Sequence, residues 1–190
     1  MTSSVPEDIL TVGAVEEAPP RTATDATRRE LVDAMFRRHY TDLLRLAVVM
    51  IGTREAAEDA VQDAFAALHR NSRALRDVTS AEAYLRSAVL NRCRSWVRRQ
   101  VTQRAARPLM LVREHEPSAE DAIVDREGEG ALVAMMRKLP RRQREVLACR
   151  FVLELSVAQT AELLEISEGS VKTHTHRGLQ TLQQRIEVPR

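Results

Sequence analysis

The chain has 190 residues and a mass of 21.4 kDa, which suits one medium domain or two small ones and excludes a large barrel enzyme. Aromatic residues make up only 3% and glycines number 6, while Ala, Leu and Val dominate the 44% hydrophobic fraction, so the composition favours packed helices over β-sheets. The formal net charge of +2 is small, so any preference for charged partners must lie in local segments. We expect an all-α protein.

The positions of the cysteines limit the kinds of site that the chain can hold, and the lengths of its apolar runs limit where the protein can be located. Cys93 and Cys149 are far apart and neither belongs to a CxxC pair, so the sequence indicates neither a zinc site nor a disulfide framework. No apolar run approaches the roughly 20 residues needed to span a bilayer, and the N-terminus lacks a basic segment followed by an apolar one. We expect a cytoplasmic protein with no membrane partner, no metal and no cofactor.

Charge is distributed unevenly along the chain. Residues 1–27 hold five acids against one arginine, and their three prolines and lack of apolar periodicity predict a disordered acidic extension. Residues 91–107 hold six arginines and no acid, a density suited to phosphate contacts. Residues 109–136 carry a net charge of −5, and residues 137–150 return to +5, with Glu145 standing among six bases.

Three helices are expected in the first half. Apolar side chains step by three and four residues between Phe36 and Ile51, and Gly52-Thr53 then supplies a stop and an N-cap for a second helix. A loop is expected at about residues 70–78, after which the capping-box pair Thr79 and Glu82 opens a third helix. The predicted inward positions of the second and third helices are Ala57, Ala60, Val61, Ala64, Phe65 and Leu68, and Leu85, Ala88, Val89, Cys93, Trp96 and Val97.

Shorter helices are expected in the second half. Pro140 can begin a helix because its missing N–H is not needed there, and the predicted core face of that helix is Val146, Leu147 and Phe151. Ser156 and Gln159 have capping-box spacing and open the next helix. Ser167 can cap the last helix, whose apolar positions are Val171, Leu179, Leu182 and Ile186. This pattern predicts a helix-turn-helix.

The last helix has the chemistry that DNA contact requires. A helix that enters a major groove must be slim and polar, and the stretch SEGSVKTHTHRG offers small hydroxyl residues, Lys172 and Arg177 for phosphates, and free amides after Ser167. The alternative to DNA contact is that this is an ordinary helix of a bundle whose polar face is exposed to solvent. The positions free to contact DNA are Ser170, Lys172, Thr173, His176 and Arg177.

Other polar groups have weaker functional interpretations. The arginine run at residues 91–107 is either a solvated face or a nucleic-acid surface beside Tyr84 and Trp96, although Trp96 fits a core position. His174 and His176 point in different directions on a helix and are poor joint metal ligands. No nucleophile, base and metal constellation has usable spacing, so an enzyme is the weakest reading. An acidic face is expected to dock a protein or to be solvated; its residues are Glu55, Glu58, Asp59 and Asp63.

These motifs together resemble the extracytoplasmic-function sigma factors of bacterial RNA polymerase. The stretches AEDAVQDAF and AEAYLRSAVLNRCRSWVRRQ resemble the second conserved region of that family, and LPRRQREVLACRFVLELSVAQTAELLEISEGSVKTHTHRGLQTL resembles the fourth. The resemblance covers about residues 30–186. It implies two small helical domains joined by a flexible linker, with a region 2 bundle at residues 28–103, an acidic linker at 104–130 and a helix-turn-helix at 131–190 after the extension at 1–27.

The resemblance also implies partners and contact residues. Asp59, Gln62 and Asp63 would dock on the clamp helices of the largest subunit of core RNA polymerase, with the flap region as a further contact. The residues that would open the −10 promoter element are Asn91, Arg94 and Arg98. The residues that would read the −35 element are Ser170, Lys172, Thr173, His176 and Arg177. An anti-sigma factor is a further partner that the family leaves open.

The chain departs from the family pattern at several positions. Ser95 stands where the family usually has Asp, Tyr84 where it often has Trp, and Thr175 and Gly178 where it tends to have larger or helix-favouring residues. These departures concern promoter preference more than family.

Two other functions remain as alternatives. One is a LuxR-type transcriptional regulator with a helical N-terminal domain, because SEGSVKTH is also close to that DNA-binding domain. The other is a helical adaptor whose basic helices bind acidic proteins.

Overall fold

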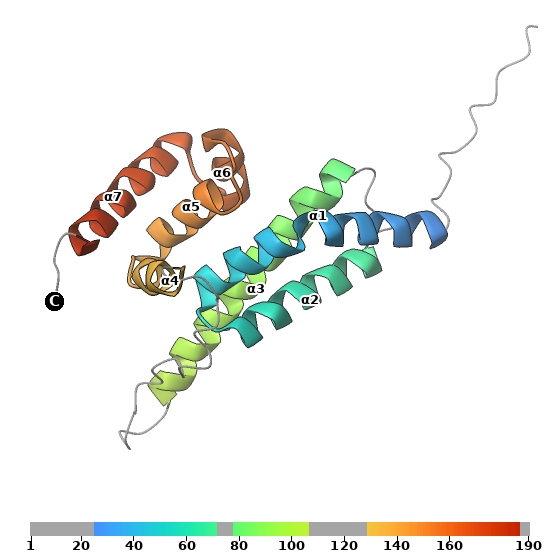
Figure 1. Cartoon of the computed structure of the whole chain (residues 1–190), viewed down its shortest axis with the longest axis horizontal. Coiled ribbons are helices and arrows are strands. Elements are labelled where there is room, and N and C mark those ends of the chain that lie inside the picture. Colours follow the sequence, from blue (N-terminus) through green and yellow to red (C-terminus); the bar gives the residue numbers. More distant parts are fainter. Residues whose placement is uncertain (1–24, 72–77, 107–128, 187–190) are drawn as a thin grey trace, which may run out of the picture.

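The computed structural model describes residues 25–71, 78–106 and 129–186, and these ranges are helical apart from short turns. The expectation of an all-α protein is confirmed for this part of the chain (Figure 1). The extension at 1–24, the loop at 72–77 and most of the expected linker, 107–128, lie outside the described residues. The helices are α1 (Asp25–Ile51), α2 (Arg54–Asn71), α3 (Val78–Ala106), α4 (Glu129–Arg137), α5 (Arg141–Phe151), α6 (Val157–Leu164) and α7 (Glu168–Ile186).

The helices α1, α2 and α3 pack against one another in a first unit. Gly52 ends α1 with a φ of +98°, a conformation that glycine adopts without a steric penalty, and its N–H donates to the Val48 carbonyl at 2.8 Å. Two bounds differ from expectation. Helix α1 begins at Asp25, inside the expected extension, and α3 begins at Val78, so Thr79 lies within the helix and Glu82 binds Arg86 instead of completing a capping box.

The helices α4 to α7 form a second unit in which short turns are fixed by local hydrogen bonds. The expected capping box at α6 is present: the Gln159 N–H donates to Ser156 Oγ at 3.1 Å, and the Ser156 N–H donates to Gln159 Oε1 at 2.8 Å. Glu165 then takes a left-handed conformation with a φ of +54°, and the Ile166 N–H reaches back to the Ala161 carbonyl at 3.0 Å. These bonds turn the chain from α6 into α7.

The expected core face of α5 was partly wrong. Val146 and Leu147 are buried, but Phe151 is 56% exposed. Instead, five consecutive residues, 145–149, are buried, because α5 is enclosed by α6 and α7 on its own unit and by α1 of the first unit. A helix packed on several sides does not show a single apolar stripe, and Phe151 lies beyond the enclosed segment. Leu179 and Ile186, expected to be apolar core positions of α7, are also exposed.

The two units pack against each other. Helices α4 and α5 contact α1, and α6 contacts α3, so the warm-coloured helices of Figure 1 lie along one side of the first unit. The Arg137 guanidinium, from α4, lies directly against Gly52 at the end of α1, in the space where any larger residue would place its Cβ. The buried side chains of both units belong to one continuous cluster. None of the helices in the described ranges is long and apolar enough to cross a bilayer.

Candidate nucleic-acid interface

The N-terminus of α7 is held by a serine cap. The Ser170 N–H donates to Ser167 Oγ at 3.1 Å, and the two serine hydroxyl oxygens are 2.9 Å apart. The cap predicted at Ser167 is therefore confirmed. It fixes the start of the helix that follows the turn at Glu165, and with it the direction in which the next two turns project their side chains.

One face of α7 carries the polar residues predicted to contact DNA. Lys172, Thr173, His176 and Arg177 are exposed, and Ser170 is half-buried beside its cap. The Thr173 hydroxyl donates to the Gly169 carbonyl at 2.9 Å, which leaves its oxygen free to accept. The opposite face of α7 buries Val171, Gly178 and Leu182. The structure thus brings the five predicted residues together on one amphipathic helix.

Gly178 explains one departure from the family pattern. A Cβ at this position would lie 2.8 Å from Leu147 Cδ1 and 3.1 Å from Leu147 Cγ, and Leu147 is itself fully packed. The glycine therefore lets α7 approach α5 closely enough to bury both helices. This close contact holds the exposed face of α7 on a rigid support.

The arginine-rich helix α3 presents its predicted contacts differently. Asn91 and Arg98 are exposed. Arg94 is turned toward the second unit, where its Nε and Nη2 atoms donate to the two carboxylate oxygens of Glu145, each at 3.0 Å. A third donor, Arg94 Nη1, lies 3.4 Å from Asn91 Oδ1. Asn91 and Arg94 are thus adjacent, but the strongest donors of Arg94 are already engaged.

Glu145, the acid that stands among six bases in residues 137–150, is buried, which the sequence analysis did not predict. Its side chain is 0% exposed and also accepts from Arg141 at 2.8 Å and from Arg142 at 2.9 Å. Burial by itself would raise the pKa of this carboxyl, but hydrogen bonds from Arg94 and Arg141 outweigh burial and hold its pKa below the usual value. The available signal was an acid placed three and four residues after two arginines and directly before the apolar run Val146–Cys149.

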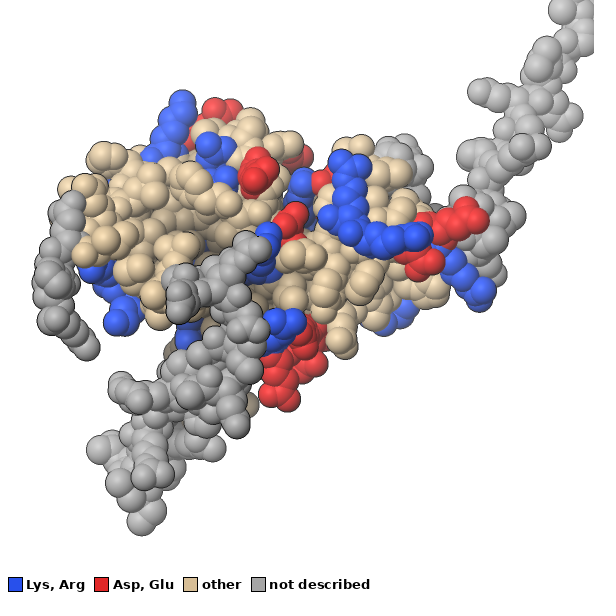
Figure 2. Space-filling model, in the orientation of Figure 1, with Lys and Arg blue, Asp and Glu red and all other residues tan. Residues whose placement is uncertain are grey.

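The acidic face of α2 points to solvent. Asp59, Gln62 and Asp63 are all exposed, on the side opposite the buried residues of this helix. Asp63 remains 77% exposed although Arg92 Nε approaches it to 3.8 Å. Figure 2 shows acidic side chains gathered at the lower edge of the three-helix unit. This face is available to a basic partner.

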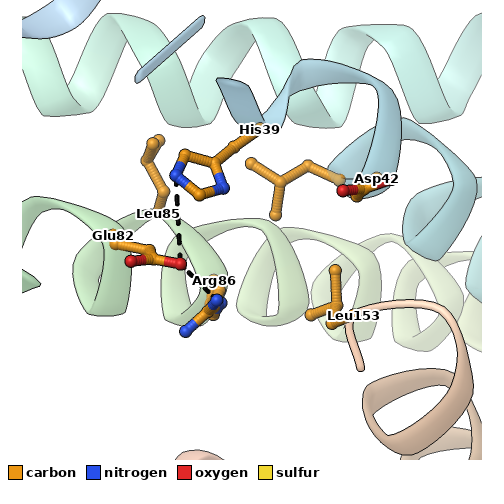
Figure 3. Close-up of a pocket in the computed structure, with 7 residues that line it drawn as sticks. His39, Asp42, Glu82, Leu85, Arg86 and Leu153 are labelled. Atoms are coloured by element: carbon orange, nitrogen blue, oxygen red, sulfur yellow. Dashed lines mark hydrogen bonds and ion pairs between the residues drawn. The ribbon is translucent and has the colours of Figure 1, made fainter. Parts of the chain in front are cut away.

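A small cavity lies where the two units meet, lined by both. His39 and Asp42 come from α1, Glu82 and Arg86 from α3, and Leu153 from the turn between α5 and α6 (Figure 3). His39 Nε2 faces Glu82 at 3.9 Å. Burial lowers the pKa of His39, and the attraction of Glu82 opposes this only partly. The cavity volume, about 30 Å³, suits water and is too small for an organic ligand.

The remaining candidates are structural. Cys93 and Cys149 are free thiols in the core, and burial raises the pKa of each to about 12, so neither is a nucleophile at neutral pH. Trp96 is half-buried and packs against the core. Within the residues described, no group of His, Cys, Asp and Glu is arranged to hold a metal ion.

Comparisons with known families match both units. Residues 35–102 match the family described as Sigma-70 region 2, and residues 129–182 match Sigma-70, region 4. The first match covers most of α1 to α3, and the second covers α4 to α7 as far as Leu182.

Individual relatives extend over most of the chain. It is 32% identical over 149 residues to the ECF RNA polymerase sigma factor SigM of Mycobacterium tuberculosis, covering 78% of this chain and 74% of that protein. It is 25% identical over 167 residues to the ECF RNA polymerase sigma factor SigX of Bacillus subtilis, covering 85% of this chain and 86% of that protein.

Two solved structures share the fold. The structure of CnrH in complex with the cytosolic domain of CnrY has a TM-score of 0.64 at 20% identity, covering 86% of this chain and 92% of that one. The sigma factor RpoE of Bartonella quintana, in complex with the anti-sigma factor NepR, has a TM-score of 0.61 at 20% identity, covering 83% and 99%.

Proposed function

The chain belongs to the extracytoplasmic-function sigma factors of RNA polymerase, and on that premise we propose how its helices divide promoter recognition. Helix α7 reads the −35 element, α3 engages the −10 element, and the exposed face of α2 docks on core polymerase. The proposed units are a region 2 bundle at residues 28–103 and a helix-turn-helix at residues 131–190.

The exposed face of α7 is the observation that carries the proposal. Lys172 and Arg177 neutralise phosphates, while Ser170, Thr173 and His176 offer donors and acceptors of a length suited to base edges. The capped N-terminus at Ser167 adds a positive helix dipole near the DNA backbone. Because Gly178 fixes the opposite face on α5, these groups enter the groove as a preformed set.

In the proposed −10 contact, Asn91 and Arg98 meet the opened strand on the exposed side of α3, and Arg94 contributes once it is released from Glu145. Extracting a base from the stack costs a few kcal/mol, so a basic surface must supplement any base pocket. The arginines of α3 supply that surface.

Docking on core polymerase uses the opposite charge. Asp59, Gln62 and Asp63 form an exposed acidic and polar face, which suits basic clamp helices of the largest subunit. The second unit would meet the flap region, and the protein would act in the cytoplasm without catalysing a reaction itself. Since the structural neighbour RpoE was solved in complex with the anti-sigma factor NepR, we include an anti-sigma factor among the expected partners.

Run-off transcription tests the proposal. Bacterial core polymerase is incubated with fragmented DNA of the source organism, with and without the chain, and with the Lys172→Ala variant. Discrete transcripts that require the chain and weaken with the variant are expected. A folded chain that yields no transcripts with a compatible core, yet binds specific duplex DNA alone, would instead be a conventional helix-turn-helix regulator.

A further inference from the structure

The contact between the two units uses a residue that the proposed function assigns to DNA. We propose that the Arg94–Glu145 ion pair is a latch that holds the free chain closed, and that it withholds Arg94 from DNA until the units separate. The inference rests on the proposed role of α3, but the closed arrangement itself is tested without promoter or polymerase.

The geometry of the pair is that of a strong, directional contact. Two parallel N–H donors of Arg94 meet the two oxygens of one carboxylate, both at 3.0 Å, across 51 residues of sequence. Bidentate guanidinium–carboxylate pairing adds geometric specificity to charge attraction, and a single ammonium group cannot reproduce it. The Arg94 side chain is 21% exposed, whereas the Glu145 side chain is fully buried. Solvent therefore reaches the pair only from the arginine.

Other contacts at the same interface act in the same direction. Arg137 of α4 lies on Gly52 at the end of α1, and Leu153 lines the cavity between α1 and α3 beside His39. The interface therefore combines charged groups with apolar packing, because Leu43 and Leu85 line the cavity beside Leu153 and the buried apolar residues of both units form one cluster. The ion pair is therefore a directional contact added to the apolar packing between the units.

The latch can open because Glu145 does not lose all its partners. Arg141 and Arg142 belong to the same helix as Glu145 and stay with it when the units separate. When the units separate, Arg94 therefore returns to solvent while Glu145 keeps two charged partners. A buried carboxylate left without a partner would cost several kcal/mol. A DNA phosphate offers Arg94 the same bidentate acceptor geometry, so DNA and Glu145 compete for one guanidinium.

The test compares three single variants of the full chain. Glu145→Gln keeps the shape of the side chain but removes its charge, so it weakens the latch and leaves Arg94 available. Arg94→Leu weakens the latch and also removes the DNA contact. Arg92→Leu is the matched control, because it removes an arginine from the same helix whose partner, Asp63, lies within the first unit.

Two readouts are used on the free protein. Small-angle X-ray scattering gives the radius of gyration, and fluorescence anisotropy gives the affinity for a labelled single-stranded oligonucleotide of mixed sequence. We expect Glu145→Gln and Arg94→Leu to increase the radius of gyration, with Arg92→Leu unchanged. Only Glu145→Gln should bind the oligonucleotide more tightly, by about three- to tenfold, because a released guanidinium adds one phosphate contact.

An unchanged radius of gyration in Arg94→Leu, with helical content intact by circular dichroism, would overturn the latch. If Glu145→Gln loses helical content, Arg94→Leu still decides, since the Arg94 side chain is partly exposed and is not part of the hydrophobic core. If Glu145→Gln opens the chain but leaves oligonucleotide affinity unchanged, the competition for Arg94 is wrong. A failure of transcription by the wild-type chain would count against the proposed function, and it would not alter the scattering result.

Discussion

The helices α7 and α3 are both proposed to contact DNA, but they hold their cations in different states. On α7, Lys172 and Arg177 are exposed on a helix fixed at its cap and along its buried face. On α3, Arg94 is paired across the unit interface with a fully buried carboxylate. The first surface is ready for a ligand as it stands, whereas the second requires the units to move.

The comparison shows that the number of charged residues in a segment does not tell how many of them are free to bind a ligand. Residues 91–107 are the most basic segment of the chain, yet one arginine of that segment, Arg94, is paired internally with Glu145. Helix α7 has fewer cations, and its Lys172 and Arg177 face solvent. With the roles proposed for α7 and α3, this arrangement favours duplex contact first and strand capture after a conformational change.

The largest expected effect comes from removing the support of α7. Gly178→Val would drive a branched side chain into Leu147 and should lower the free energy of unfolding by about 2–3 kcal/mol. Gly169→Ala is the matched control, since the nearest atom to its Cβ is Ser167 Oγ at 3.9 Å, and it should not destabilise the chain. Urea unfolding followed by circular dichroism measures both. Equal stability of wild type and Gly178→Val would mean that α7 is not held by this contact.

The next prediction distinguishes the proposed DNA contact of α7 from that of α3. Lys172→Ala should weaken promoter binding by the polymerase complex by about tenfold and reduce the salt slope by about one, because one phosphate contact is lost. Binding to core polymerase should be unaffected. Arg94→Ala should weaken promoter binding by the complex while leaving single-strand binding by the free chain unchanged. If Lys172→Ala and Arg94→Ala have the same effects on DNA binding, both in the free chain and in the complex, then α3 and α7 do not differ as proposed.

A smaller stabilisation is expected at the turn between α6 and α7. Glu165 occupies a left-handed conformation with a φ of +54°, which favours glycine. Glu165→Gly should raise the free energy of unfolding by about 1 kcal/mol, because the strain at this position exceeds the added entropy of the unfolded chain. Thermal unfolding measures the change, and a lower melting temperature would show that the turn is not strained.

The smallest effect is a pH dependence at the unit interface. Burial lowers the pKa of His39 from 6.5 in the folded chain, with Glu82, Arg86, Arg38 and Asp42 as its charged neighbours. The unfolded chain therefore binds more protons, so this contribution to stability is complete above pH 6.5 and is lost as pH falls through the folded pKa. His39→Gln should flatten the stability profile between pH 5 and 7, measured by urea unfolding. A His39→Gln profile that runs parallel to that of wild type between pH 5 and 7 would contradict this prediction.

Local sequence signals predicted much of the fold, and packing between distant residues escaped them. The caps at Ser156 and Ser167 were predictable because a side chain and a backbone N–H three residues apart decide them. The exposure of Phe151 was not, because it depends on how far α1 covers α5. The amphipathic face of α7 was predicted correctly, while its contact roles remain a proposal.

The Arg94–Glu145 pair shows why the rest could not be predicted. Its partners belong to separate units, and nothing in the local pattern of α3 indicates that one of its arginines has an acid to meet. Gly178 is similar, since only the proximity of Leu147 makes a glycine necessary there. Both features depend on how helices distant in the sequence are placed relative to one another. The spacing of apolar residues along the chain does not reveal that placement.

The most direct test of the account is the distance between the two units in the free chain and in the complex with core polymerase. Cysteines placed at the exposed positions Thr41 on α1 and Gln184 on α7 carry a fluorescent donor and acceptor. The native thiols, buried with pKa values of about 12, react slowly with the dyes. The account predicts high energy transfer in the free chain and a clear drop on adding core polymerase. Equal transfer in the two states would contradict it, because α3 would then never release Arg94.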